Sequence, residues 1–219
     1  MNGPLLHRVT VWDWPTRAFH WLLAALIAFA WWSYETDRMA WHRTAGYAVL
    51  ALIAFRLFWG VFGSQTARFA NFLRGPRAIV RYLAGRAEFP VGHNPLGALS
   101  VVALLAVTGA LTVSGLFAVD DDGLEPGPLA DTINFARAQR AEHWHGILFD
   151  VLLALVAAHL LAILFYFVRG DNLVRPMIDG TKLVPVQAQA PRQASLLLRI
   201  VGIGVAGATF AGLLWLDRG

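Results

Sequence analysis

The chain has 219 residues, of which 57% are hydrophobic and 15% are charged, and its formal net charge is +4. This composition departs from that of soluble domains and indicates an integral membrane protein. The absence of cysteine excludes disulfides, thiolate-held iron–sulfur clusters and covalent c-type haem attachment. The arginines lie between apolar segments, which suits membrane orientation rather than nucleic-acid binding.

Five apolar segments approach the roughly 20 residues that a membrane-spanning helix needs. In chain order they cover about residues 17–34, 41–62, 95–119, 142–168 and 196–216. The N-terminal stretch lacks the residue order and the cleavage site of a secretory signal peptide, so we expect the first span to be retained. The sequence therefore predicts an all-α integral membrane protein without a separate soluble domain.

The linkers between these spans differ in charge. Those after the second and fourth spans are basic, with Arg68, Arg74, Arg77, Arg81, Arg86, Arg169, Arg175, Lys182 and Arg192. Basic linkers stay in the cytoplasm, which predicts a cytoplasmic N-terminus and a periplasmic C-terminus. The linker after the third span lies on the opposite side and carries Asp120, Asp121, Asp122, Glu125 and Asp131. The stretch 66–86 suits a short amphipathic surface helix broken near Gly75, or a solvated loop.

Four histidines fall at two depths in this topology. His20 lies near the cytoplasmic end of the first span and His42 near the outer end of the second. His145 and His159 share the fourth span; at roughly 1.5 Å and 100° per residue they lie about 21 Å apart on nearly one face. His145 then shares the outer level with His42, and His159 shares the inner level with His20. Each histidine taken alone could make an ordinary interhelical hydrogen bond, but two pairs at matching depths predict two bis-histidine haems.

Three arginines are candidates for contact with the propionates of such haems. Arg56 lies near the cytoplasmic end of the second span, where a buried cation needs an anion. It could bind a propionate of the inner haem or extend to the lipid headgroups. Arg17, one turn before His20, and Arg43, next to His42, have the same two options.

Several other residues have both a structural and a functional interpretation. His143 points away from the ligand face and is expected at the surface or at a cap. His93 precedes the third span, and a role at the start of that helix competes with a quinone hydrogen bond or an alternative inner ligand. Gly204, Ala208 and Gly212 form a small-residue stripe, which is expected to pack on the core, with a homodimer or partner interface as the alternative.

The pieces around these residues resemble the bacterial cytochrome b561 family, which includes the b-type cytochrome subunits of nickel-iron hydrogenases. They are VWDWPTRAFHW, WHRTAGYAVLALIAFRLFWG, GHNPLG and HWHGILFDVLLALVAAHL with a following DNLV, within about residues 9–180. The resemblance implies that residues 1–180 form a four-helix transmembrane bundle holding two b haems. It implies the axial pairs His20 with His159 and His42 with His145, as the depths do. Residues 181–219 add a linker and a fifth C-terminal transmembrane helix, whose role the resemblance does not supply.

The resemblance also implies a function in the bacterial inner membrane, among membrane lipid. The chain would transfer electrons between a periplasmic partner, such as a c-type cytochrome or a hydrogenase-like subunit, and the quinone pool. An alternative is a stand-alone superoxide:quinone oxidoreductase, which would be an enzyme rather than a relay. A non-haem transporter or structural protein would need more acids inside the spans, where Asp150 is the clear candidate. The acidic outer linker could attract a basic donor or simply be solvated.

Overall fold

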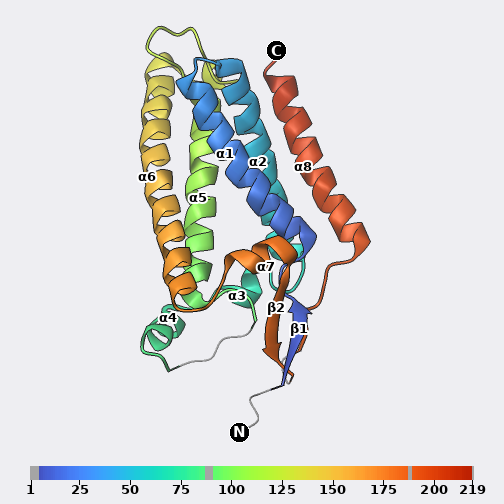
Figure 1. The fold of residues 1–219 in the computed structure, drawn as a ribbon. Coiled ribbons are helices and arrows are strands. Elements are labelled where there is room, and N and C mark those ends of the chain that lie inside the picture. Colours follow the sequence, from blue (N-terminus) through green and yellow to red (C-terminus); the bar gives the residue numbers. More distant parts are fainter. Residues whose placement is uncertain (1–4, 87–90, 187–188, 219) are drawn as a thin grey trace.

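The computed structural model describes residues 5–86, 91–186 and 189–218. In this part of the chain, five long helices form a bundle and a small sheet lies at one end of it (Figure 1). The long helices are α1 (Trp14–Glu35), α2 (Met39–Phe62), α5 (Pro95–Phe117), α6 (Phe135–Val168) and α8 (Leu196–Leu216). The shorter elements are β1 (Leu6–Thr10), α3 (Phe69–Phe72), α4 (Pro76–Leu83), a 3-10 turn (Ala130–Thr132), α7 (Val174–Asp179) and β2 (Thr181–Pro185).

Polar caps set the start of most of the long helices. Asp13, Asn94, Asn134 and Ser195 each accept a hydrogen bond from a backbone N–H one turn later, at the starts of α1, α5, α6 and α8. With Asn134 as its cap, α6 begins at Phe135, seven residues before the predicted start at residue 142. The resulting helix of 34 residues is about 51 Å long and exceeds a hydrocarbon core of roughly 30 Å, so α6 extends well beyond the apolar layer.

Four helices, α2, α5, α6 and α8, are long and apolar enough to cross a membrane. Helix α1 has 22 residues and packs along α2, but polar side chains that include Arg17 and His20 interrupt its apolar character. Its crossing of the membrane stays a prediction from the sequence. The chain is thus a multi-pass membrane protein with a helical bundle, as its composition indicates.

The helices pack as neighbouring pairs. Helix α1 packs on α2, α5 packs on α6, and α2 contacts both α5 and α8. One buried cluster joins α1 and α2 through Phe19, Phe55 and Trp59, and partly buried residues of α8 pack against it. Helix α8 comes close to α2 at Gly202, where an added Cβ would lie 3.0 Å from a ring carbon of Phe55. Helix α8 is therefore packed on the core through Gly202.

The predicted small-residue stripe of α8 does not make this contact. Gly204, Ala208 and Gly212 are exposed, and an added Cβ at either glycine would meet nothing within 4 Å. The prediction that this stripe packs on the core is therefore wrong. The rotation of α8 about its own axis depends on which side chains of α2 it meets, and this is not visible in its own sequence.

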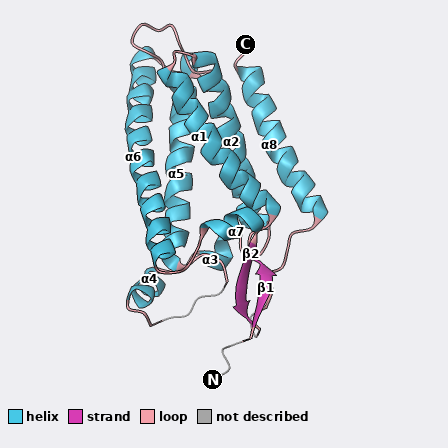
Figure 2. Cartoon of the chain, in the orientation of Figure 1, coloured by secondary structure: helices cyan, strands magenta, loops and turns pink. Residues whose placement is uncertain are grey.

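The two ends of the bundle differ. At one end, β1 and β2 form an antiparallel pair with Leu6 opposite Pro185 and Thr10 opposite Thr181, as Figure 2 shows. This sheet was not expected in an all-α fold, because its strands come from segments far apart in the sequence. Helices α3 and α4 lie at the same end and are separated near Gly75, in agreement with the predicted broken surface helix. The acidic linker lies at the other end.

Candidate functional site

The inner pair of histidines faces across the bundle. His20 of α1 and His159 of α6 have ring centroids 6.4 Å apart with an interplanar angle of 51°. The Nδ1 atom of His20 is buried and has no partner among the described residues. The helices that carry the two rings belong to different packed pairs, α1 with α2 and α5 with α6. The rings therefore meet across the boundary between these two pairs.

The outer pair has the same arrangement with one further feature. His42 of α2 and His145 of α6 have ring centroids 6.0 Å apart. Nδ1 of His42 lies 2.9 Å from the carbonyl oxygen of Ala30, and Nδ1 of His145 lies 2.8 Å from that of Leu111. Because a carbonyl can only accept, each Nδ1 carries the proton and donates it. Nε2 of each ring is then the unprotonated nitrogen, which is the form that binds a metal.

Each of the two histidine pairs is spaced to fit one iron atom between its two imidazoles. With a metal–nitrogen bond of about 2.0 Å on either side, two axial imidazoles place their ring centroids about 6.3 Å apart. The observed values are 6.4 Å and 6.0 Å. Within the described residues, no three His, Cys, Asp or Glu side chains gather as a metal site. The donor sets are thus two separate histidine pairs, which suits haem.

Glycine lies next to the ring of His145 in the outer pair. An added Cβ on Gly115 of α5 would lie 2.9 Å from Cε1 and 3.0 Å from Nδ1 of His145. Gly46, one turn after His42, has open space where its Cβ would stand. Neither glycine was singled out from the sequence. Glycine inside a helix is nevertheless a signal for close approach, because it weakens the helix unless packing requires it.

The three candidate arginines differ in their surroundings. Arg56 is only 3% exposed, its Nη1 has no partner in the described chain, and its guanidinium lies 4.7 Å from the ring centre of Phe69. Arg17 donates from Nη1 to the carbonyl of Ile178, and its Nε is buried without a partner. Arg43 instead forms ion pairs that neutralise its charge, at 2.6 Å with Glu125 and 3.7 Å with Asp217.

A buried carboxylate that sequence reasoning missed lies at the inner end. Asp13 is 3% exposed; it caps α1 by accepting from the backbone N–H of Thr16 at 2.9 Å. It also accepts from Nε1 of Trp59 at 3.1 Å and from the hydroxyl of Ser64. The start of α1 is thereby tied to the end of α2, which positions Arg17 and His20 one and two turns later.

The remaining histidines are not brought to either pair. His143 is exposed, which confirms the predicted surface position. His93 lies between the rings of Trp12 at 4.5 Å and Phe72 at 4.6 Å, so a role as inner iron ligand is not supported. Burial, together with the nearby Arg56 cation, lowers the pKa of His93 to about 3. Asp150, the acid expected inside the spans, lies within α6 and is exposed on its surface.

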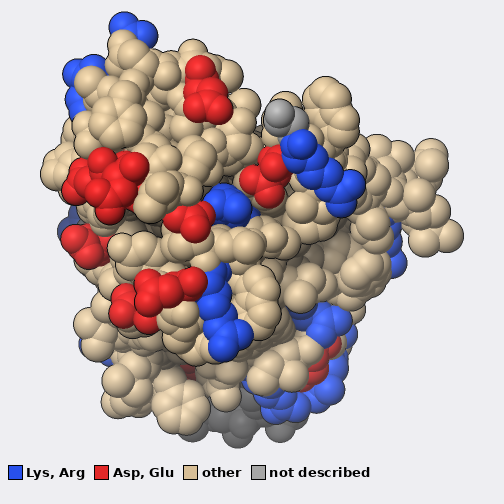
Figure 3. Space-filling model, turned by 90° about the horizontal axis from the view of Figure 1, so that it is seen from above, with Lys and Arg blue, Asp and Glu red and all other residues tan. Residues whose placement is uncertain are grey.

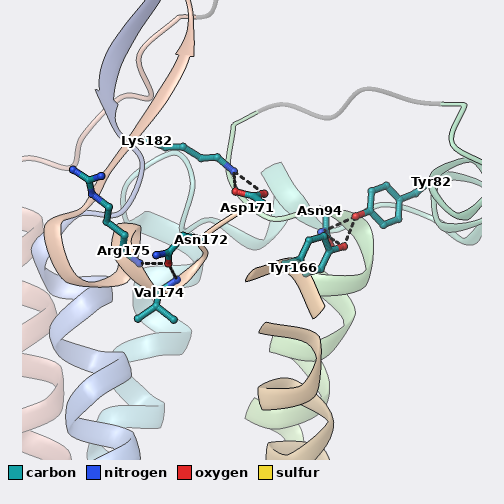
Figure 4. Close-up of polar contacts among 8 residues, drawn as sticks. All are labelled: Tyr82, Asn94, Tyr166, Asp171, Asn172, Val174, Arg175 and Lys182. Atoms are coloured by element: carbon teal, nitrogen blue, oxygen red, sulfur yellow. Dashed lines mark hydrogen bonds and ion pairs between the residues drawn. The ribbon is translucent and has the colours of Figure 1, made fainter. Parts of the chain in front are cut away.

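A hydrogen-bonded cluster joins the surface helix α4 to the inner end of the bundle (Figure 4). Nδ2 of Asn94 donates to the hydroxyls of Tyr82 and Tyr166 at 2.9 Å each, and the two hydroxyls are bonded to one another. Burial, followed by the bond to Tyr166, raises the pKa of Tyr82 to about 12. Lys182 pairs with Asp171 nearby at 3.1 Å. The contacts of Tyr82 with Asn94 and Tyr166 hold α4 against the ends of α5 and α6.

Comparison with known proteins gives one match. No curated protein and no solved structure matches the chain. A family model described as prokaryotic cytochrome b561 matches residues 11–180, which is most of the chain and includes both histidine pairs. The chain therefore belongs to the prokaryotic cytochrome b561 family.

Proposed function

We propose that this membrane cytochrome holds two b haems and transfers electrons between a periplasmic redox partner and the quinone pool. Membership of the family supports a b-type cytochrome in electron transfer. The observation that carries the two-haem proposal is the pair of histidine–histidine distances, 6.4 Å and 6.0 Å, each of which fits one iron atom.

The histidines would act by holding the cofactor rather than by chemistry of their own. The two imidazoles of each pair would hold the iron of a haem b, which would suit outer-sphere electron transfer. A haem b bound in this way supplies a one-electron redox couple. The carbonyls of Ala30 and Leu111 hold the protonated Nδ1 atoms of His42 and His145, which keeps both rings in place and makes each Nε2 more basic.

The depth of the pairs supports electron transfer across the apolar layer. His145 and His159 are separated by about 21 Å along α6, so the two cofactors would lie near opposite surfaces. The termini lie at opposite ends of the bundle, with the arginine-rich elements at the N-terminal end (Figure 1). The bias of arginines toward the cytoplasm supports an inner-membrane location with the N-terminus inside and the C-terminus in the periplasm.

The charge of the outer end favours a protein partner with a basic surface. Figure 3 shows this end, where acidic side chains gather around a few basic ones. Asp121, Asp122 and Asp131 of the linker are exposed there. Such a surface attracts a cationic protein such as a basic c-type cytochrome and repels an anion such as superoxide. The proposal is therefore an electron relay rather than a superoxide oxidase.

An absorption spectrum with haem quantification tests the proposal. The purified protein should contain two b haems per chain, and His159→Ala should lose the inner one while His42→Ala loses the outer one. His143→Ala, a change at an exposed histidine of the same helix as His159, should keep both. Absence of b-type bands after haem-sufficient expression would refute the proposal. Stopped-flow mixing with reduced c-type cytochrome and with superoxide then distinguishes the two donors.

A further inference from the structure

Buried polar atoms without a partner concentrate at the inner end of the bundle. Native proteins leave few such groups, so each one points to something that binds it. Those of the described chain at this end include Thr16 Oγ1, Arg17 Nε, His20 Nδ1, Arg56 Nη1, Arg68 Nε and His93 Nδ1. All of these side chains can donate a hydrogen bond and the three arginines carry positive charge, which favours an anionic ligand.

Arg56 is the most demanding member of this group. Its side chain is 3% exposed, and no carboxylate of the described chain forms an ion pair with it. Asp13 is close enough to influence its charge, but the oxygens of Asp13 are already occupied by Thr16, Trp59 and Ser64. A buried guanidinium without a paired anion is strongly unfavourable. The Nη1 atom can therefore bind an anion that the described residues do not supply.

His93 is held beside Arg56. The rings of Trp12 and Phe72 enclose its imidazole, and Phe72 contacts Phe69, whose ring supports the Arg56 guanidinium. The positive charge of Arg56 is near enough to oppose protonation of His93. A neutral imidazole has one N–H and one bare nitrogen. Its buried Nδ1 can therefore offer one hydrogen bond next to the arginine.

The unpartnered arginine nitrogens at this end favour an anionic ligand. Arg17, Arg56 and Arg68 each have a buried nitrogen without a partner among the described residues. Asp13 is a buried carboxylate close enough to Arg56 to influence its charge, but it forms no ion pair with it. A haem b brings two propionates, which are ionised at neutral pH, and the inner histidine His20 lies two turns of α1 beyond Asp13.

We propose that Arg56 and His93 together bind the propionates of the inner haem, Arg56 through an ion pair and His93 through a hydrogen bond from Nδ1. This inference rests on the proposed two-haem function and adds His93 as a cofactor-binding residue. It assigns His93 to the edge of the inner haem rather than to its iron or to the start of α5. The ring sandwich of Trp12 and Phe72 would fix the direction of the hydrogen bond.

Redox titration and haem transfer of the purified holoprotein test this inference. Arg56→Gln removes a cation near the inner haem, so the midpoint potential of that haem should fall while that of the outer haem stays unchanged. His93→Leu removes a donor to a charged group, and transfer of the inner haem to apomyoglobin should become about tenfold faster. His93→Gln retains an N–H donor and should restore most of the wild-type rate. The matched control is His143→Leu, which changes an exposed histidine at the other end.

The outcomes separate this inference from the function on which it rests. A wild-type protein without haem would refute the proposed function itself. Two haems with the same inner-haem potential and transfer rate in His93→Leu and His143→Leu would overturn the assignment of His93. The same result with a raised KM for quinol would assign His93 to a quinone carbonyl instead. If Arg56→Gln does not accumulate, Arg56→Lys keeps the charge but not the planar fork, and faster transfer of the inner haem alone is expected.

Discussion

Substitution of Gly115 by alanine should weaken the binding of the outer haem and leave the binding of the inner haem unchanged. Gly115 lies in the last turn of α5 against the ring of His145, and the added Cβ would stand 2.9 Å from Cε1 of that ring. Ordinary carbon–carbon contact is about 3.5 Å, so the ring or the helix must move by roughly 0.6 Å. The ring cannot move freely, because its Nδ1 is held by the carbonyl of Leu111 at 2.8 Å.

The size of the effect follows from these distances. A metal–nitrogen bond tolerates about 0.2 Å, which is less than the required displacement. Overpacking of this kind costs about 1–3 kcal/mol, which corresponds to an affinity for the outer haem reduced about 5-fold to 150-fold. His20 and His159 do not contact Gly115, so the affinity for the inner haem should not change.

Haem quantification and redox titration of the purified variant would measure this. The matched control is Gly109→Ala on the same helix, whose Cβ would make only an ordinary contact of 3.9 Å with Ile53. We expect Gly115→Ala to lose the outer component, or to bind it with one axial ligand and a high-spin spectrum. Two haems with unchanged potentials in both variants would show that His145 does not hold a haem iron in this position.

Two further predictions concern the contacts that hold the ends of the bundle. Tyr47→Phe removes the hydroxyl that donates to Asp217 at 2.8 Å, so amide hydrogen exchange at the outer end of α8 should accelerate about tenfold. The control Tyr34→Phe changes an exposed tyrosine and should have no effect on exchange in α8. Burial and the bond to Tyr166 raise the pKa of Tyr82 from 10.0 to about 12. The neutral phenol is favoured in the fold, so its stabilisation is present below pH 10 and is lost as the pH rises toward 12. The free energies of unfolding of the wild type and of Tyr82→Phe should therefore converge as the pH rises through this range. A constant difference between the two free energies would contradict this prediction.

The pairing of the four histidines could be predicted from the sequence. Spacing along one helix placed His145 and His159 on a single face, and the arginine bias of the linkers gave His20 and His42 their depths. The structure brings together the same two pairs. This worked because depth depends on helix rise and on span direction, which are properties of each segment by itself.

Rotation and lateral contact were much harder to predict. The exposed stripe around Gly204 depends on which side of α8 meets its neighbour. In a membrane helix nearly every position is apolar, so the pattern that reveals the buried face in a soluble helix is weak. The start of α6 at Phe135 was also missed, because α6 continues past the apolar segment into a polar stretch.

The sequence by itself determined the membrane class and the long helices, and it predicted which histidines share a level, since composition, local periodicity and linker charge act within single segments. Only the tertiary structure decided that Asp13 joins Trp59 and Ser64, that Gly115 lies against His145, and that His93 stands near the buried Arg56. Each of these contacts joins residues of separate helices or loops. Their identity depends on how the helices rotate and on how the linkers close, and that information is distributed over the whole chain.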